Sequence, residues 1–229
     1  MKKKKIVVIH QPDFIPYLGF FHRLCYCNVY VILDHVQLLK RGWHHRDKIK
    51  GPNGEYWLTI PINRKTNSPP INKAKIDYSQ NWVDKHLQTI THFYKKAKFF
   101  ETIFPEIKLI YEKNYTLLID LNMAMLKFFW KLFSINVKTI YSSSLNINSK
   151  KSFLIFDIMK DIGGTHYLSG IGAKNYLDDS LFCTENIEVT WHNFKHPVYP
   201  QLYKDFIPYL SCLDFAMNCG NSLHSYLRV

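Results

Sequence analysis

Two short runs of hydrophobic residues near the N-terminus are separated by a proline-containing loop and a segment of helical character. Residues 5–10 read KIVVIH and residues 29–34 read VYVILD, and both runs are continuous and rich in β-branched residues. Such runs are typical of strands that are buried on both faces of a parallel sheet. With a helix expected over residues 18–27, the pattern predicts a strand, a helix and a second strand that pairs in parallel with the first.

The next hydrophobic pattern is that of a hairpin. Residues 47–50 and 56–62 flank the sequence GPNGE, in which Pro52 and the Asn53-Gly54 pair supply turn geometry. Pro61 ends the second strand, because proline lacks the N–H group that a strand ladder needs.

Two helices are predicted in the middle of the chain. From residue 81 the hydrophobic positions recur at spacings of four and three residues, which places them on one face: Val83, Leu87, Ile90, Tyr94 and Ala97. Residues 114–133 are hydrophobic on most sides of a second helix, so we expect this helix between layers; a helix on a membrane surface is the weaker interpretation. His86 and His92 are expected at the surface or in helix packing rather than in a catalytic site.

In the last part of the chain, strand and helix patterns alternate again. Ser149 is a candidate N-cap for a helix that ends at Asp161, before the Gly163-Gly164 pair. THYLSG at residues 165–170 and IEVTWHNF at residues 187–194 predict strands, and IGAKNYL between them predicts a helix.

These patterns together predict an α/β fold with a mostly parallel, Rossmann-like sheet and a helical insertion between its two halves. A length of 229 residues and 47% hydrophobic content suffice for one domain with its own core. We expect the first half of the sheet and the hairpin at residues 1–62, the helical insertion at 81–135, the second half at 142–200 and a C-terminal helical tail at 201–229.

The charge balance narrows the class of ligand. Thirty Lys and Arg against eighteen Asp and Glu give a net charge of +12, which favours phosphate, nucleotide, nucleic acid or an anionic membrane face. Much of the excess is lysine scattered singly, so a lysine-rich genome explains part of it equally well. No stretch approaches the ~20 apolar residues that span a membrane.

The five cysteines form an odd set without paired CxxC spacing, and no signal peptide precedes the first strand. We therefore expect a reducing cytoplasm. Cys25 and Cys27 are the closest pair, but in an extended segment they would point to opposite faces. This argues against a shared metal ion, and no metal site is expected.

Polar residues at the predicted strand ends are the first candidates for a site. Ligands of an open α/β sheet collect outside the carboxyl ends of its strands, where His10, Asp34 and the Ser169-Gly170 pair are expected. A histidine there can neutralise a phosphate or act as a general acid or base, because its pKa is near ~6.5. The alternative is a structural histidine that ties down the loop through a backbone carbonyl.

The segment LLKRGWHHRDKIKG, residues 38–51, is the densest basic patch beyond the N-terminal lysines. Its arginines suit a bidentate grip on phosphate or carboxylate, and its tryptophan could stack on a base or a sugar. A nucleic-acid contact and a hairpin edge protected by charge are the alternatives. The candidate ligand-binding residues here are Lys40, Arg41, Trp43, His45 and Arg46, with Gln37 just before them.

The segment HNFKHPVYPQ, residues 192–201, follows the last predicted strand. His192 and His196 are four residues apart, but Pro197 and Pro200 argue against the helix that would align them on a zinc ion. We expect a rigid loop that borders the pocket and contributes His196, Tyr199 and Gln201. The sequence contains neither a Ser-His-Asp signature nor a GxxxxGK loop.

Four segments together resemble the WbqC-like protein family, in order and over nearly the whole chain. They are HQPDFIPYLGFFHRL, VILDHVQLLKRGWHHRDKIKGPNGEYWLTIPI, HYLSGIGAKNYL and FKHPVYPQLYKDFIPYLSCLDFAMNCG. The resemblance implies a bacterial protein encoded among polysaccharide and O-antigen (lipopolysaccharide) biosynthesis genes. Members of this family have been suggested to attach glycine or a related acyl group to an aminosugar. The chain departs from the family pattern at His44-His45-Arg46, where an aromatic or Asn-Arg pair is usual.

A weaker similarity concerns the fold. The strand, proline-containing loop, helix and second strand are similar to the start of nucleotidylyltransferases and pantothenate-synthetase-like ligases, which bind ATP through an HxGH motif. The second histidine of that motif is missing here, so its phosphate chemistry is not carried over. Fold similarity alone does not give function.

The resulting hypothesis is a cytoplasmic enzyme that transfers an acyl or aminoacyl group to the amine of a nucleotide-linked aminosugar. His10 is the expected general base, and Gln11 or the Ser169-Gly170 backbone would donate to the oxyanion. Lys40, Arg41 and Arg46 would hold a diphosphate or acyl phosphate, and Tyr17 or Trp43 the sugar or base. Whether ATP with magnesium or an aminoacyl-tRNA supplies the acyl group stays open. The alternative is a non-catalytic module that binds a nucleotide, tRNA or another polyanion.

Overall fold

The computed structural model describes residues 3–63, 68–175 and 177–227, and the chain divides into two compact units. The sheet unit comprises residues 1–11, 22–35 and 136–195, and the helical unit comprises residues 12–21, 36–135 and 196–229. Among the described residues, no helix has the length and apolar character needed to cross a membrane.

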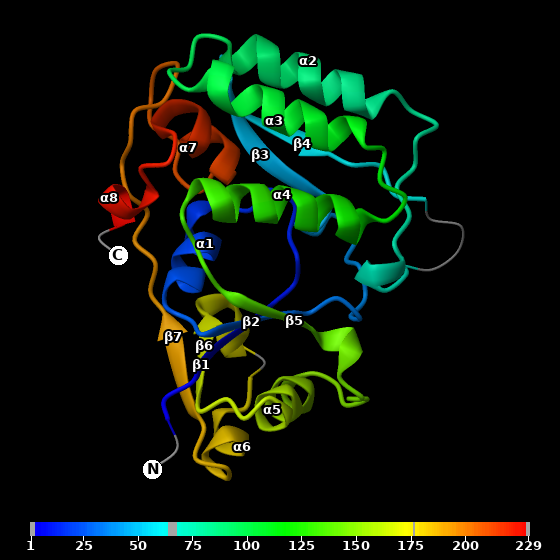
Figure 1. Cartoon of the computed structure of the whole chain (residues 1–229), viewed down its shortest axis with the longest axis vertical. Coiled ribbons are helices and arrows are strands. Elements are labelled where there is room, and N and C mark those ends of the chain that lie inside the picture. Colours follow the sequence, from blue (N-terminus) through cyan, green and yellow to red (C-terminus); the bar gives the residue numbers. More distant parts are fainter. Residues whose placement is uncertain (1–2, 64–67, 176, 228–229) are drawn as a thin grey trace. The chain divides into compact units, whose positions relative to one another are not determined.

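The sheet unit is built on five parallel strands (Figure 1). In chain order they are β1 (Ile6–His10), β2 (Val29–Ile32), β5 (Lys138–Tyr141), β6 (His166–Gly170) and β7 (Glu188–His192). In space the order is β5-β2-β1-β6-β7, and every neighbouring pair is parallel. The middle of β1 and all of β2 are buried, which explains their continuous hydrophobic sequences. The predicted α/β fold with a Rossmann-like parallel sheet is confirmed.

The strand order reverses next to β1. The chain moves outward from β1 through β2 to β5, and then returns to the other side of β1 for β6 and β7. β1 and β2 pair along four residues, up to His10 opposite Ile32, whereas the register of β1 and β6 ends at Val7 opposite Tyr167. The pairing between β1 and β6 therefore stops before their carboxyl ends, at the switch point where such sheets bind ligands.

Two helices cover part of the sheet. α5 (Ser152–Asp161) packs against α6 (Asp179–Cys183), and α6 contacts β7. Phe182 of α6 is fully buried, and its ring is stacked on Tyr167 of β6 with 5.9 Å between centroids. A further helix, α1 (Leu18–Cys25), begins in the helical unit, and its last four residues belong to the sheet unit.

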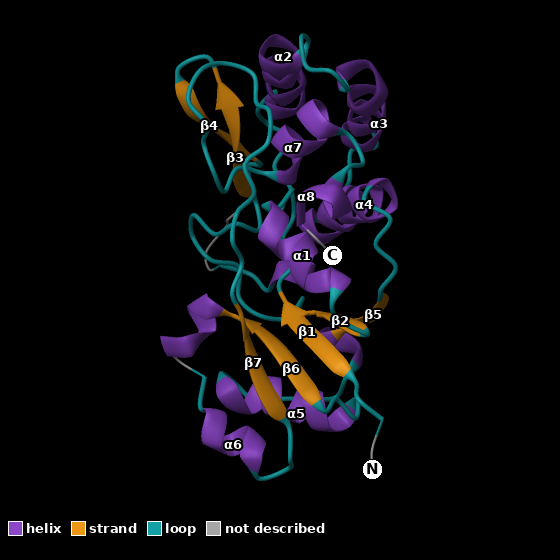
Figure 2. Cartoon of the chain, turned by 90° about the vertical axis from the view of Figure 1, so that its left-hand side faces the viewer, coloured by secondary structure: helices purple, strands orange, loops and turns teal. Residues whose placement is uncertain are grey.

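The helical unit combines a hairpin with a group of helices (Figure 2). The hairpin strands are β3 (Arg46–Gly51) and β4 (Gly54–Thr59), which form a separate two-stranded antiparallel sheet as predicted from the GPNGE turn. The helices are α2 (Trp82–Tyr94), α3 (Phe100–Glu112), α4 (Leu118–Leu132), α7 (Cys212–Cys219) and α8 (Leu223–Leu227). α3 contacts α2, α4 and α7, and α7 also contacts β3. α4 is buried on most of its surface, as its hydrophobic sequence predicts.

Several sequence predictions need correction at the helix ends. Ser149 is not an N-cap: α5 begins at Ser152, after Lys151, whose φ of 55° sets a sharp turn without a side-chain cap. α4 begins at Leu118 rather than at residue 114, because Asn114 has a φ of 48°. α1 ends at Cys25 rather than at residue 27. The Gly163 stop signal is correct, since its φ of 64° is left-handed.

The segment IGAKNYL is not an α-helix over its described residues. Ile171–Asn175 form a 3-10 helix, and Tyr176 lies outside the described residues. The face of α2 is also rotated from the predicted one, because Trp82 and His86 are buried while Val83 and Leu87 are only half-buried. Ile90 and Tyr94 are buried as expected, and His86 takes part in helix packing.

Candidate functional site

The carboxyl ends of β1 and β6 flank the switch point of the sheet unit. His10, the last residue of β1, is half-buried, and its Nδ1 lies 2.9 Å from the backbone oxygen of Gln11. A carbonyl can only accept, so Nδ1 carries the proton in this contact and Nε2 holds the ring lone pair. The hydroxyl of Tyr30 donates to the His10 oxygen at 3.1 Å. His10 is therefore tied to the backbone, in a tautomer that suits a base.

Asp34 lies just beyond β2 and is 2% exposed. Its carboxylate accepts hydrogen bonds from the Ser142 hydroxyl at 2.9 Å, the Ser143 N–H at 2.8 Å and the Ser143 hydroxyl at 2.6 Å. These bonds join the carboxyl end of β2 to the end of β5. Asp34 thus holds two strand ends together at the edge of the sheet where ligands are expected.

Gly170, the last residue of β6, lies against the guanidinium of Arg23 from α1. A Cβ atom added at Gly170 would lie 2.8 Å from Nη1 of Arg23. Arg23 is only 4% exposed, and no described residue forms a hydrogen bond or an ion pair with its side chain. The neighbouring Ser169 is 1% exposed, and its hydroxyl is 3.4 Å from the Gly170 oxygen. A buried cation therefore lies at the end of β6 without an anionic partner among the described residues.

Two histidines meet beside this arginine. Nδ1 of His22, from α1, lies 2.6 Å from Nε2 of His192, the last residue of β7. Burial lowers the pKa of His192 to about 4, with further contributions from the charges of Arg23 and His22. Burial also lowers the pKa of His22. Both imidazoles are thus neutral near pH 7, and one donates its hydrogen to the other.

We call these residues the sheet site: His10, His22, Arg23, Ser169, Gly170 and His192. The sequence predicted His10 and the Ser169-Gly170 pair from their positions at strand ends. It considered His192 only for a metal ion, and it missed Arg23. Two signals could have found them, because His192 also ends a strand and Arg23 is a lone cation within an apolar helix.

The basic segment belongs to the helical unit and surrounds the start of the hairpin. The rings of Trp43 and Trp57 are 5.4 Å apart at an angle of 32°, and the Arg46 guanidinium lies 4.1 Å from the Trp57 centroid. Nε of Arg46 donates to the oxygen of Arg41 at 3.2 Å. Trp43 is 49% and Trp57 36% exposed. Trp43, Trp57, Arg41 and Arg46 form a cationic aromatic surface that we call the hairpin platform.

His44 and His45 lie below this surface, at 2% and 7% exposure. Nδ1 of His44 lies 3.0 Å from a carboxylate oxygen of Asp13. The amide of Asn122 in α4 donates to the backbone oxygens of His44 and Pro12, at 2.7 and 2.8 Å. His44 therefore anchors the basic segment. His45, which the sequence placed among the ligand-binding residues, is buried beside it in the chain. Lys40 and Gln37, also predicted, are exposed.

The predicted loop residues Tyr199 and Gln201 bind to a buried carboxylate. The Tyr199 hydroxyl and the Gln201 amide both donate to Asp214 Oδ2 at 2.9 Å, and the Tyr94 hydroxyl donates to Oδ1 at 2.7 Å. Lys50, which is 1% exposed, donates to Gln201 Oε1 at 3.0 Å. Burial raises the pKa of Asp214 and lowers the pKa of Lys50. This network joins β3, α2 and α7 to the loop.

Two other predicted residues contact the same loop. His196 is half-buried, and its Nδ1 lies 2.8 Å from the Pro197 oxygen. The ring of Tyr17 lies 6.1 Å from that of Tyr209, and its backbone forms a bridge with Ser211. These contacts belong to the helical unit.

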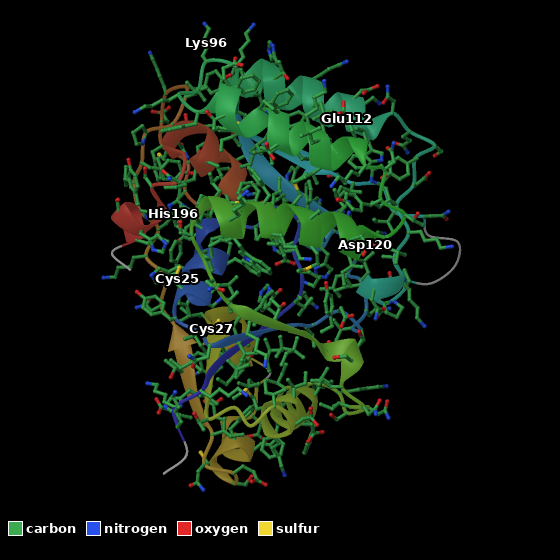
Figure 3. The ribbon with its side chains drawn as sticks, in the orientation of Figure 1. Cys25, Cys27, Lys96, Glu112, Asp120 and His196 are labelled. Carbon is green, nitrogen blue, oxygen red and sulfur yellow. The ribbon has the colours of Figure 1, made fainter. Side chains whose placement is uncertain are left out.

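Metal-binding side chains do not gather within the described parts of the chain: three or more His, Cys, Asp or Glu residues nowhere form a suitable group. Cys25 and Cys27 lie at the end of α1 and just after it (Figure 3). Both are free thiols, and burial raises their pKa values to about 11 and about 12. They are therefore protonated near neutral pH and poor metal ligands in that state.

Comparison with known proteins gives two matches. The model of the WbqC-like protein family matches residues 11–226 of the chain. The uncharacterized protein Rv1507c of Mycobacterium tuberculosis (strain ATCC 25618 / H37Rv) is 29% identical over 228 residues, which cover 98% of each chain. No solved structure matches this chain.

Proposed function

Because this chain belongs to the WbqC-like protein family, we propose that it is an enzyme that forms an amide on an aminosugar. It transfers an acyl or aminoacyl group of the glycine type to the amine of a nucleotide-linked aminosugar in bacterial surface polysaccharide synthesis. The observation that carries the proposal is the sheet site at the switch point, where His10 and Gly170 end two strands whose pairing has already stopped.

The reaction needs a nucleophilic amine, an activated carbonyl and a group that takes the amine proton. The amine nitrogen forms a bond to the acyl carbon, and the bond from that carbon to the donor's oxygen breaks, with the electron pair leaving on this oxygen. Nε2 of His10 accepts the proton, because Nδ1 holds its own proton against the Gln11 oxygen. The Gln11 side-chain amide or the backbone of Ser169-Gly170 donates to the oxyanion. An acyl phosphate made from ATP and an aminoacyl-tRNA both provide such an oxygen leaving group.

The test is direct incubation of the purified protein with a nucleotide-linked aminosugar that has a free amine. Glycine with ATP and magnesium is the donor in one reaction, and glycyl-tRNA in the other. Mass spectrometry is expected to detect the glycyl amide of the sugar nucleotide in one of them. Absence of an acylated product with both donors contradicts the proposed function for glycine transfer.

His10→Gln tests the assigned base. Glutamine can still donate to the Gln11 oxygen but cannot take up a proton, so kcat is expected to fall by about 10²- to 10⁴-fold. KM for the aminosugar should change little, since the substitution leaves the binding groups in place. His92→Gln, at an exposed position of α2, is the matched control and should retain full activity. Equal kcat in wild type and His10→Gln removes His10 from the mechanism.

A second candidate function is the binding of a nucleic acid or another polyanion without catalysis. The hairpin platform favours it, because two exposed tryptophans and a guanidinium stack on one another at the surface. Aromatic side chains beside arginines are the usual contacts of unpaired bases and their phosphates.

A further inference from the structure

We propose that Arg23, at the ends of β6 and β7, forms a binding subsite for an oxyanion, the phosphate or carboxylate group of a substrate. The guanidinium binds this group beside Gly170, with the imidazoles of His22 and His192 next to it. The subsite extends the proposed function by naming a group on the substrate, and it is measured by binding without any turnover.

The unpaired guanidinium is the first argument. A guanidinium carries five N–H donors, and buried polar groups are nearly always hydrogen-bonded. Arg23 is 4% exposed, yet none of the described residues bonds to its side chain, and its Nε is fully buried. Its charge is also unmatched, because no carboxylate of the described chain forms an ion pair with it. A bound oxyanion supplies both the acceptors and the charge.

The second argument is the space beside the guanidinium. Any side chain at residue 170 would begin 2.8 Å from Nη1 of Arg23, so only glycine lets the guanidinium lie there. Gly170 and His22 are both partly exposed, which puts the guanidinium close to the surface. Gly170 is also the last residue of β6, on the side of the switch point where sheets of this kind bind their ligands.

The third argument is the state of the two histidines. Nδ1 of His22 and Nε2 of His192 share one hydrogen at 2.6 Å, so the pair is held in a fixed orientation. Neither neutral ring forms an ion pair with Arg23 as a carboxylate would. One of the two imidazole N–H groups is used in their mutual hydrogen bond, which leaves one N–H that can donate to a bound anion. Arg23 is therefore the one charged group among these three side chains, and its charge is available to an anion.

Titration calorimetry of the full chain tests the subsite with three probes: inorganic phosphate, uridine diphosphate and glycine. Phosphate and the diphosphate represent a sugar nucleotide, and glycine represents a carboxylate donor. Arg23→Met is expected to weaken the binding of the preferred probe by about 10-fold or more, since hydrogen bonds to charged groups are lost. Gly170→Ala should weaken it too, because the methyl group displaces the guanidinium while its charge remains.

Gly172→Ala is the matched control, because a Cβ there meets no atom within 4 Å, and its affinity should equal that of wild type. Thermal unfolding checks that the variants fold. Removal of a buried unpaired charge should leave the unfolding temperature of Arg23→Met unchanged or higher without anion, and added anion should raise it in wild type alone. If Arg23→Met does not fold, the affinity of Gly170→Ala for the preferred probe tests the subsite by itself.

Two results overturn the proposal: no probe binds the wild type, or the folded Arg23→Met and Gly170→Ala variants bind as tightly as wild type. The acyl-transfer reaction is measured separately. Oxyanion binding that depends on Arg23, without an acylated product, retains the subsite and rejects the proposed function. An acylated product without oxyanion binding that depends on Arg23 retains the proposed function and rejects the subsite.

Discussion

His86 lies within α2, 7% exposed, and both of its ring nitrogens have partners. Nε2 accepts from the Thr59 N–H at 3.1 Å, and Nδ1 lies 3.1 Å from the Tyr111 hydroxyl. Burial lowers the pKa of His86 to about 4. The same effect acts on His192. At the scale of single residues, burial thus sets the charge state of histidines that look alike in the sequence.

This shift predicts a loss of stability in acid. The unfolded chain binds a proton at His86 near pH 6.5, whereas the folded chain binds it only near pH 4. Stability is therefore complete above pH 6.5 and falls as the pH drops toward 4, by about 3 kcal/mol for this group. Urea unfolding of wild type and His86→Gln between pH 7 and pH 4 measures the difference.

In His86→Gln the acid-dependent loss should be smaller, because glutamine does not titrate. The comparison with wild type also removes the opposite contribution of Asp47 and Asp214, whose pKa values are raised by burial. His92→Gln, exposed on the same helix, should follow the wild-type curve. An unchanged acid dependence in His86→Gln would contradict the assignment.

At the scale of elements, α3 shows where a sequence pattern misleads. Pro105 lies inside this helix, and a proline there removes one backbone hydrogen bond and usually marks a helix end. The helix nevertheless continues, because Ile103, Ile107 and Tyr111 recur on one buried face. Packing against α2, α4 and α7 outweighs the local cost. The segment lies in the predicted helical insertion at 81–135, but no separate helix was predicted for it, and its packing against α2, α4 and α7 exists only in the tertiary structure.

Pro105→Ala should therefore stabilise the protein. The position is exposed, and alanine restores the missing N–H donor toward the Glu101 carbonyl and removes the ring clash. We expect a gain of roughly 1–3 kcal/mol in the free energy of unfolding. Denaturant unfolding measures this gain. Glu106→Ala, at the neighbouring exposed position, is the control, and its change in the free energy of unfolding should be near zero. A loss of stability in Pro105→Ala would mean that the proline ring packs favourably.

At the scale of the whole molecule, the net charge of +12 has a local and a dispersed component. Arg41 and Arg46 belong to the hairpin platform, whereas lysines such as Lys95 and Lys96 are exposed at the end of α2. If the platform binds nucleic acid, affinity depends on its tryptophans and on salt. If the charge is only dispersed, binding is weak and insensitive to any single residue.

The platform is tested with single-stranded RNA and with tRNA. Trp43→Ala should weaken binding by about 5- to 150-fold, because stacking on one base contributes about 1–3 kcal/mol. Affinity should also fall steeply with salt. Fluorescence anisotropy at several salt concentrations measures both, and Leu109→Ala, at another exposed apolar position of the helical unit, is the control. Equal affinities of Trp43→Ala and wild type exclude the platform as the contact.

The sequence by itself determined the parallel sheet, the hairpin and the position of His10. Continuous runs of β-branched residues are typical of buried parallel strands, and the carboxyl ends of parallel strands lie along one edge of the sheet. It also determined the family, through motifs along nearly the whole chain.

The tertiary structure alone decided which polar side chains are buried and what they face. His44 and His45 are adjacent to exposed Trp43 in the sequence, yet they lie below the surface. Arg23 lies against Gly170, which is 147 positions later in the sequence, because the strand order places the end of β6 beside α1. Such contacts depend on the packing of distant segments, which no local pattern encodes.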